Sequence, residues 1–226
     1  MFHFSYLSLI LDQYRLQSVT FYAIMEQNID RYTGLITERD KNMTCCVTGH
    51  RSAGFPFPRN EGDIRYIIYK NELHATVEEL IKMGFDRFIT GGCEGADLDF
   101  AKVVILMRDC VYREDSVITL EAALPCPYIS PKKFTPLQEY REDILHSCDK
   151  TTVISDHYHR GCMHLRNRHM VEKSDLVLAV WNGRKKGGTW NTIQYAKKLN
   201  KKIKYIMLTD FEDTSTALSR VNYDFI

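Results

Sequence analysis

The chain has 226 residues, of which 44% are hydrophobic and 26% are charged, and this composition is typical of a globular protein with one sizeable domain. With 30 Lys and Arg against 29 Asp and Glu, the formal net charge is +1, so the overall charge does not indicate nucleic-acid or membrane binding. The seven cysteines are odd in number and scattered, which argues against a disulfide framework and favours a reducing, cytoplasmic location.

Residues 1–42 differ in character from the rest of the chain. Residues 1–11 are apolar and aromatic, but the run lacks a basic leader and is too short to span a bilayer. An amphipathic helix is one interpretation of this run, and the polar residues 26–42 are typical of a linker. We expect residues 1–42 to be an extension with little structure and residues 43–226 to form the domain.

The first predicted strand, Thr44–Thr48, is followed by Gly49, His50 and Arg51. In open α/β sheets, ligands bind beyond the carboxyl ends of the strands. His50 and Arg51 are therefore candidates for contacts to an anion, and the alternative is that both are solvated loop residues. A long helix is expected over residues 63–83, where apolar side chains follow a 3.6-residue period.

The next predicted strand, Asp86–Thr90, runs into the glycine-rich stretch Gly91–Asp97 and then into a helix that ends near Arg108. Glycines let a backbone approach a ligand closely, and the start of a helix favours an anion. The stretch matches neither the dinucleotide fingerprint nor the Walker pattern, so a tight turn is the alternative. Glu94 and Asp97 are expected either to cap the helix or to accept hydrogen bonds from ligand hydroxyls.

The remaining elements continue the alternation of strands and helices. Strands are expected at residues 117–125, 151–155, 175–181 and 204–208, and helices at residues 135–148, 161–173 and 190–200. This order predicts an α/β fold of the Rossmann-like, three-layer αβα type, with a mostly parallel sheet of about six strands.

A second glycine-rich loop, Asn182–Thr189, also follows a strand and precedes a helix. In a doubly wound sheet, the loops after the second and fifth strands open at the same edge. We therefore expect one cleft with two walls that favour an anion.

For three other features, the sequence allows both a functional role and a purely structural one. The segment 157–164 holds several histidines but matches no closed zinc pattern, so we predict no metal site. The lysines of residues 197–204, with Arg184–Lys186, would suit a nucleic-acid patch, but a solvated helix face without interleaved aromatic residues is favoured. Cys93 at a helix start would be a reactive thiol, or simply a small residue that fits the turn. No cofactor is predicted.

The motifs together resemble the YpsA/YoqJ-like family, a bacterial Rossmann-like family of the SLOG superfamily. The superfamily also holds the LOG phosphoribohydrolases and the DprA DNA-processing proteins. The resemblance covers about residues 43–208 and rests on Cys46–Arg51, Gly91–Asp97, Arg166–Val171 with Ser174 and Asp175, Trp181–Gly183 and Gly187–Thr189. It implies a nucleotide or a nucleotide-derived ligand.

The LOG enzymes resemble this chain at Arg166, four residues before Met170, and at Gly188-Thr189. Their catalytic glutamate lies two positions after that threonine, where this chain has Asn191. Cleavage of an N-glycosidic bond needs a carboxylate, which asparagine does not provide.

Three functions follow as hypotheses. The first is binding of a nucleotide-like small molecule, in a sensor-like role, by a chain that could form a homo-oligomer. The second is a nucleotide N-glycosidic hydrolase with a relocated carboxylate, with Glu94, Asp97 and Arg166 as catalytic candidates. The third is DNA binding by analogy with DprA, which the net charge disfavours. The candidate ligand-binding residues are Thr48, Gly49, His50, Arg51, Gly91, Gly92, Glu94, Gly95, Asp97, Arg166, Asn167, Asn182, Gly183, Gly187, Gly188 and Thr189.

Overall fold

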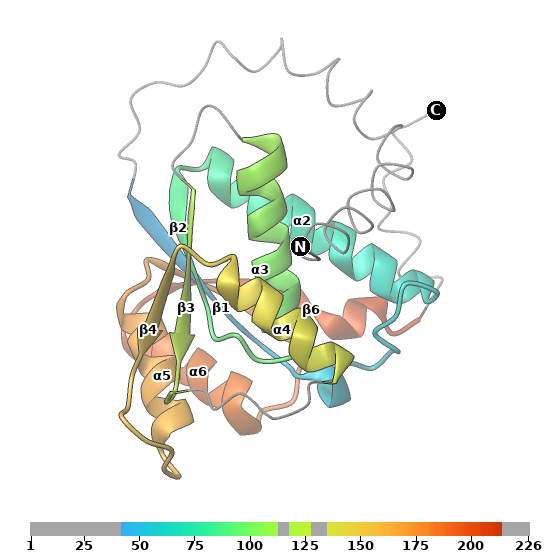
Figure 1. Ribbon diagram of the computed structural model, residues 1–226. Helices are drawn as coiled ribbons and strands as arrows, with labels where there is room; N and C mark the ends of the chain where they lie inside the picture. Colours follow the sequence, from blue (N-terminus) through green and yellow to red (C-terminus); the bar gives the residue numbers. More distant parts are fainter. Residues whose placement is uncertain (1–41, 113–117, 128–134, 214–226) are drawn as a thin grey trace. The chain divides into compact units, whose positions relative to one another are not determined.

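The computed structural model describes residues 42–112, 118–127 and 135–213, all within the compact unit Asp40–Ile226 (Figure 1). The predicted extension therefore lies outside the described residues, apart from Asn42. Residues that alternate along each strand face opposite sides of the sheet, so Cys45 and Val47 join one core while Cys46 joins the other.

Within the described residues, six strands form one sheet in which every pairing is parallel, in the order β4-β3-β2-β1-β5-β6. The prediction of a Rossmann-like α/β fold is confirmed. The strands are β1 (Met43–Gly49), β2 (Phe85–Thr90), β3 (Thr119–Leu124), β4 (Lys150–Val153), β5 (Leu176–Trp181) and β6 (Lys202–Met207).

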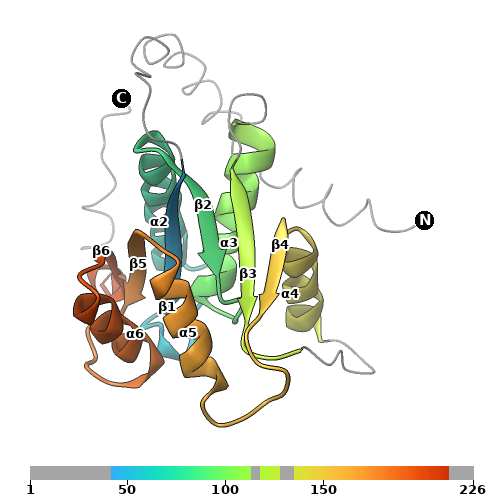
Figure 2. The same cartoon turned by 90° about the vertical axis from the view of Figure 1, so that its left-hand side faces the viewer.

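The helices cover both faces of this sheet (Figure 2). Helices α2, α3 and α4 lie on one face, and α5 and α6 pack against each other on the opposite face. The α-helices are α2 (Ile64–Lys82), α3 (Ala96–Leu106), α4 (Pro136–His146), α5 (Cys162–Glu172) and α6 (Gly187–Lys198); the short helices are η1 (Ser52–Gly54), η2 (Met107–Val111) and η3 (Leu208–Phe211).

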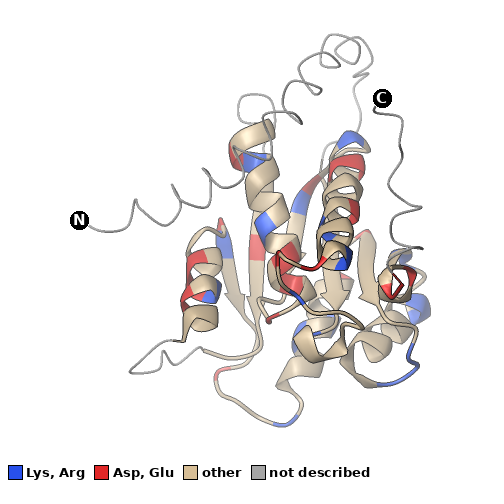
Figure 3. Ribbon diagram, turned by 90° about the vertical axis from the view of Figure 1, so that its right-hand side faces the viewer, with Lys and Arg blue, Asp and Glu red and all other residues tan. Residues whose placement is uncertain are grey.

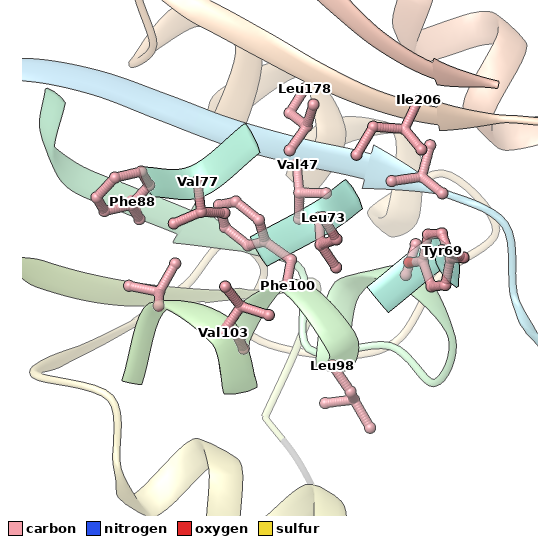
Figure 4. Packing of buried hydrophobic residues seen from close by; sticks show 14 of the residues in the cluster. Val47, Tyr69, Leu73, Val77, Phe88, Leu98, Phe100, Val103, Leu178 and Ile206 are labelled. Atoms are coloured by element: carbon pink, nitrogen blue, oxygen red, sulfur yellow. The ribbon is translucent and has the colours of Figure 1, made fainter. Parts of the chain in front are cut away.

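The larger core lies between the sheet and helices α2 and α3. Leu73 and Val77 of α2 and Phe100 of α3 are fully buried there against Val47 and Leu178 of the sheet (Figure 4). Burial of a side chain of this size contributes about 1.5–3 kcal/mol. The smaller core, between the sheet and α5 and α6, includes Met170 and Ala196. Together these cores hold the strand ends, and hence the loops beyond them, in fixed positions.

The loop after β1 is held down by a buried ionic network. Arg59 Nη2 donates to Asp99 Oδ1 of α3 at 2.6 Å, and the Tyr66 hydroxyl of α2 donates to the same oxygen at 3.1 Å. The Arg59 guanidinium also lies 5.2 Å from the centre of the Phe55 ring. These contacts join the loop to two helices, so the network positions one wall of the site described next.

Candidate functional site

The candidate site lies where the order in which strands are added to the sheet changes direction. From β1 the chain adds β2, β3 and β4 on one side and then places β5 and β6 on the other. The carboxyl ends of β1 and β5 therefore diverge into loops at a topological switch point, where open α/β sheets bind ligands.

A cavity of about 330 Å³ lies at this point, and we call it the switch-point pocket. It joins the loop after β1, the loop after β5 and the first turn of α6. The lining residues are His50, Gly54, Asn182, Arg184, Lys186, Gly187 and Gly188.

The amino-terminal end of α6 forms one wall of this pocket. The sequence predicts this helix from Trp190, but it begins at Gly187, so both glycines belong to its first turn. Lys186, at the N-cap, makes no side-chain capping hydrogen bond, and a methyl group added at Gly187 or Gly188 would meet no other atom within 4 Å. First-turn N–H groups have no partner within their own helix, so this exposed wall suits an anion.

The end of β1 forms the opposite wall. Asn182 Nδ2 donates to the Gly54 carbonyl at 2.9 Å, and Thr189 Oγ1 donates to the Gly49 carbonyl at 2.9 Å, so the two loops are joined directly. Burial lowers the pKa of His50 below its ordinary value of 6.5, and Arg184 adds to this effect while Asn182 opposes it. Within the described residues, His50 Nε2 has no hydrogen-bond partner.

A second cavity, of about 360 Å³, lies beyond β2 and β3, and we call it the β2 pocket. Its walls are mostly apolar, with Arg51, Glu94 and Arg141 as the charged residues among those that line it. Arg141 of α4 donates from Nε to the Gly92 carbonyl at 2.7 Å and so holds the glycine loop. The other lining residues are Gly91, Gly92, Cys93, Leu98, Leu124, Pro125, Cys126, Pro127, Leu137, Gln138 and Met163.

The sequence predicts one cleft with two glycine walls, and in the described residues the two glycine loops line two neighbouring pockets that share no lining residue. The physical reason is the strand order, because β1 lies between β2 and β5 and its loop fills the space between their loops. Gly95 brings that loop close, since a methyl group there would lie 2.3 Å from the His50 carbonyl oxygen. Arg51 therefore borders the β2 pocket while its neighbour His50 borders the switch-point pocket.

Arg166 and Asp97 are buried against each other beneath the glycine loop. They are 5% and 7% exposed, and Arg166 Nη1 lies 3.4 Å from Asp97 Oδ2. Asp97 also accepts from the Cys93 N–H at 3.4 Å, and Arg166 Nη2 donates to Cys93 Sγ at 3.3 Å. Burial raises the pKa of Asp97, and Arg166 opposes this rise. In this structure both side chains hold the loop, whereas the sequence assigns them to ligand contacts.

The predicted site residues thus divide into three groups. His50, Asn182, Gly187 and Gly188 line the switch-point pocket, and Arg51, Gly91, Gly92 and Glu94 line the β2 pocket. The others border neither pocket: Thr48, Gly49, Gly95, Asp97, Arg166, Asn167, Gly183 and Thr189.

Several lining residues were not predicted as part of the site. Gly54 and Arg141 come from segments without a motif, and only tertiary packing brings them to the pockets. The sequence favours a solvated face for Arg184 and Lys186, although their position in the glycine loop is a usable signal. Asn167, a predicted ligand contact, donates from Nδ2 to Thr192 Oγ1 at 2.9 Å in this structure and joins α5 to α6.

No group of three or more His, Cys, Asp or Glu side chains in residues 42–112, 118–127 and 135–213 is placed to hold a metal ion. In the same ranges, no helix has the length and apolar character needed to cross a membrane.

Comparison with known proteins places the chain among similar sequences and folds. It is 30% identical over 138 residues to the uncharacterized SPbeta prophage-derived protein YoqJ of Bacillus subtilis strain 168. The aligned region covers 57% of this chain and 80% of YoqJ. A structure of DNA processing protein A from Helicobacter pylori, described for its single-stranded DNA binding mode, aligns with a TM-score of 0.47 and 17% identity over 74% of this chain and 66% of that one. The family model YpsA, described as the YspA SLOG family, matches residues 45–214. The chain therefore belongs to the YpsA (YspA SLOG) family.

Proposed function

We propose that the chain binds a nucleotide or a phosphorylated nucleoside derivative, with its phosphate in the switch-point pocket. The observation that carries this proposal is the open first turn of α6, where Gly187 and Gly188 are exposed beside Arg184 and Lys186. Backbone N–H groups, the positive end of a helix and two cations all favour a phosphate.

The nucleoside of the same ligand would reach across the loop of His50 and Arg51 into the neighbouring β2 pocket, whose apolar walls support this part of the proposal. Leu98, Leu124 and Met163 offer surfaces against which a base or ribose would pack, and Arg51 and Glu94 offer polar contacts at its edge. Ligand sites of this kind combine apolar walls with a few polar groups that orient the ligand.

A panel of ligands tests this proposal by thermal shift. The chain would be heated with adenosine, AMP, ADP, ADP-ribose and inorganic phosphate. Nucleosides and nucleotides of the other bases would be tested in the same way. At a concentration of 100 Kd, a ligand stabilises the folded state by about 2.7 kcal/mol, or roughly 5–11 °C for a domain of this size. We expect phosphorylated ligands to raise the melting temperature and adenosine to do so far less. Equal shifts with adenosine and AMP, or no shift with any nucleotide, would contradict the proposal.

A second candidate function, hydrolysis of a nucleotide at its N-glycosidic bond, rests on Glu94. Its carboxylate is half-buried and lines the β2 pocket, whereas Asp97 is buried with Arg166 and Asn191 is exposed on α6. A carboxylate in this position would stabilise the oxocarbenium-like transition state or activate water. Chromatography of the same incubations would detect the free base, and Glu94→Gln should abolish its release. Release that persists in Glu94→Gln would rule out this role.

A further inference from the structure

The small net charge of the chain conceals an uneven distribution. The stretch 176–209, which contains β5, α6 and β6, has no Asp or Glu. Since the whole chain has a net charge of +1 and this stretch contributes +8, the rest carries −7. On the helices of the opposite face, acidic and basic residues stand side by side (Figure 3). The basic residues of the stretch are Arg184, Lys185, Lys186, Lys197, Lys198, Lys201, Lys202 and Lys204.

These cations gather at the two ends of α6. Arg184–Lys186 precede its first turn, and Lys197–Lys202 span its last turn and the following loop. A helix of 12 residues is about 18 Å long, so the two groups are separated by roughly that distance.

Most of these cations have no acidic partner. Lys204 pairs with Glu79 of α2, and Lys201 Nζ donates to the Glu172 carbonyl. In the part of the chain that the structure describes, the others form no ion pair: Arg184, Lys185, Lys186, Lys197, Lys198 and Lys202. Unpaired positive charge of this extent is complementary to a polyanion.

An aromatic cluster lies between the two groups of cations. The rings of Trp181 and Trp190 are stacked, with their centres 5.4 Å apart and their planes at 16°. Tyr205 of β6 lies 6.2 Å from Trp181 and is 37% exposed, and Lys197 Nζ lies 6.0 Å from the centre of the Trp190 ring. The Trp181 indole N–H donates to the Arg184 carbonyl at 3.1 Å, which ties this cluster to the basic loop.

The sequence gives no sign of aromatic residues interleaved with these lysines, and on that ground favours a solvated helix face. The fold adds an observation that the sequence pattern lacks, because pairing of β5 with β6 and packing of α6 bring Trp181, Trp190 and Tyr205 together. Rings among unpaired cations are the two components of a surface that binds single strands.

We infer that this face, the α6 face (Arg184–Lys186, Trp181, Trp190, Lys197–Lys202 and Tyr205), binds a single-stranded nucleic acid. Its phosphates contact the cations, and an unpaired base stacks at the aromatic cluster. A length of about 18 Å spans roughly five nucleotides at the 3.4 Å spacing of a stacked strand, and fewer where the strand is extended. An acidic peptide would leave the rings without a role. The face shares Arg184 and Lys186 with the switch-point pocket, but the variants below change neither residue, so the two proposals are tested separately.

The two tryptophans of the chain both lie in this face, so its intrinsic fluorescence is a direct probe. The full chain would be titrated with (dT)10 in 50 mM salt, and we expect quenching that saturates. We expect three to five phosphate contacts. A plot of the logarithm of the binding constant against the logarithm of the salt concentration should then have a slope of about −2 to −3.5. The same titration with (U)10 tells whether the strand is DNA or RNA.

A pair of triple variants separates this face from charge in general. K197Q/K198Q/K202Q should weaken binding of labelled (dT)10, followed by anisotropy, by about tenfold or more and reduce the salt slope. The control, K82Q/K150Q/K173Q, removes the same charge elsewhere and should change the affinity less than twofold. Circular dichroism would verify that both variants fold. The inference is overturned if (dT)10 neither quenches nor binds in 50 mM salt, if both triple variants lose affinity equally, or if polyglutamate or phosphatidylserine vesicles bind and the oligonucleotides do not.

Discussion

At the scale of single residues, Gly91 makes room for the side chain of Arg166. A methyl group added at Gly91 would lie 1.2 Å from Arg166 Nη1, so the glycine provides the space in which the guanidinium lies. The motif Gly91–Asp97 therefore has a packing role in addition to the anion-binding role that its sequence suggests.

His50 should make ligand binding depend on pH. Burial holds its pKa below 6.5, so the ring is neutral at pH 7, and a bound phosphate would raise that pKa. A ligand that raises this pKa binds more tightly as the pH falls from the bound-state pKa toward the free-state pKa, by at most tenfold per unit, and a range from pH 8 to 6 brackets the ordinary value of 6.5.

Calorimetric titration over this range would test the effect of His50. ADP-ribose suits the experiment, because a monophosphate has a second pKa near 6 that would obscure the result. His50→Gln should bind with little dependence on pH. An affinity that weakens as the pH falls from 8 to 6, or an equal dependence in His50→Gln, would show that His50 does not contact the phosphate.

At the scale of the elements, the ion pair of Arg59 and Asp99 fastens the loop after β1 to helix α3. This loop borders the switch-point pocket. Asp99→Ala would leave the guanidinium, 14% exposed, without its partner. The free energy of unfolding should fall by about 3 kcal/mol, since an unpaired buried charge is costly. Urea unfolding would measure this loss.

An exposed pair of the same length serves as the control for Asp99→Ala. Arg108 and Asp109 are also 2.6 Å apart, but Asp109 is 50% exposed. Asp109→Ala should therefore cost no more than about 1 kcal/mol. Similar losses in the two variants would mean that burial of the Arg59–Asp99 pair does not set its contribution.

For the whole molecule, the sequence predicts the fold more completely than the site. Period-2 and period-3.6 patterns identify the elements because burial of one face governs both, and glycines show where strands end. The separation of the two pockets depends on β1 lying between β2 and β5, and no local pattern encodes that order. Arg141 and Gly54 reach the pockets through packing between distant segments, and the cluster of Trp181, Trp190 and Tyr205 is likewise tertiary.

The most direct test of the central proposal, a phosphate on the first turn of α6, is calorimetric titration of Gly188→Asp with the nucleotide that stabilises the chain most. Space around Gly188 is open, and an acidic residue in the first turn of a helix is favourable, so the variant should fold as stably as the original chain. Its carboxylate would occupy the anion position, and we expect nucleotide affinity to fall by at least about a hundredfold. Unchanged affinity in Gly188→Asp would contradict the account.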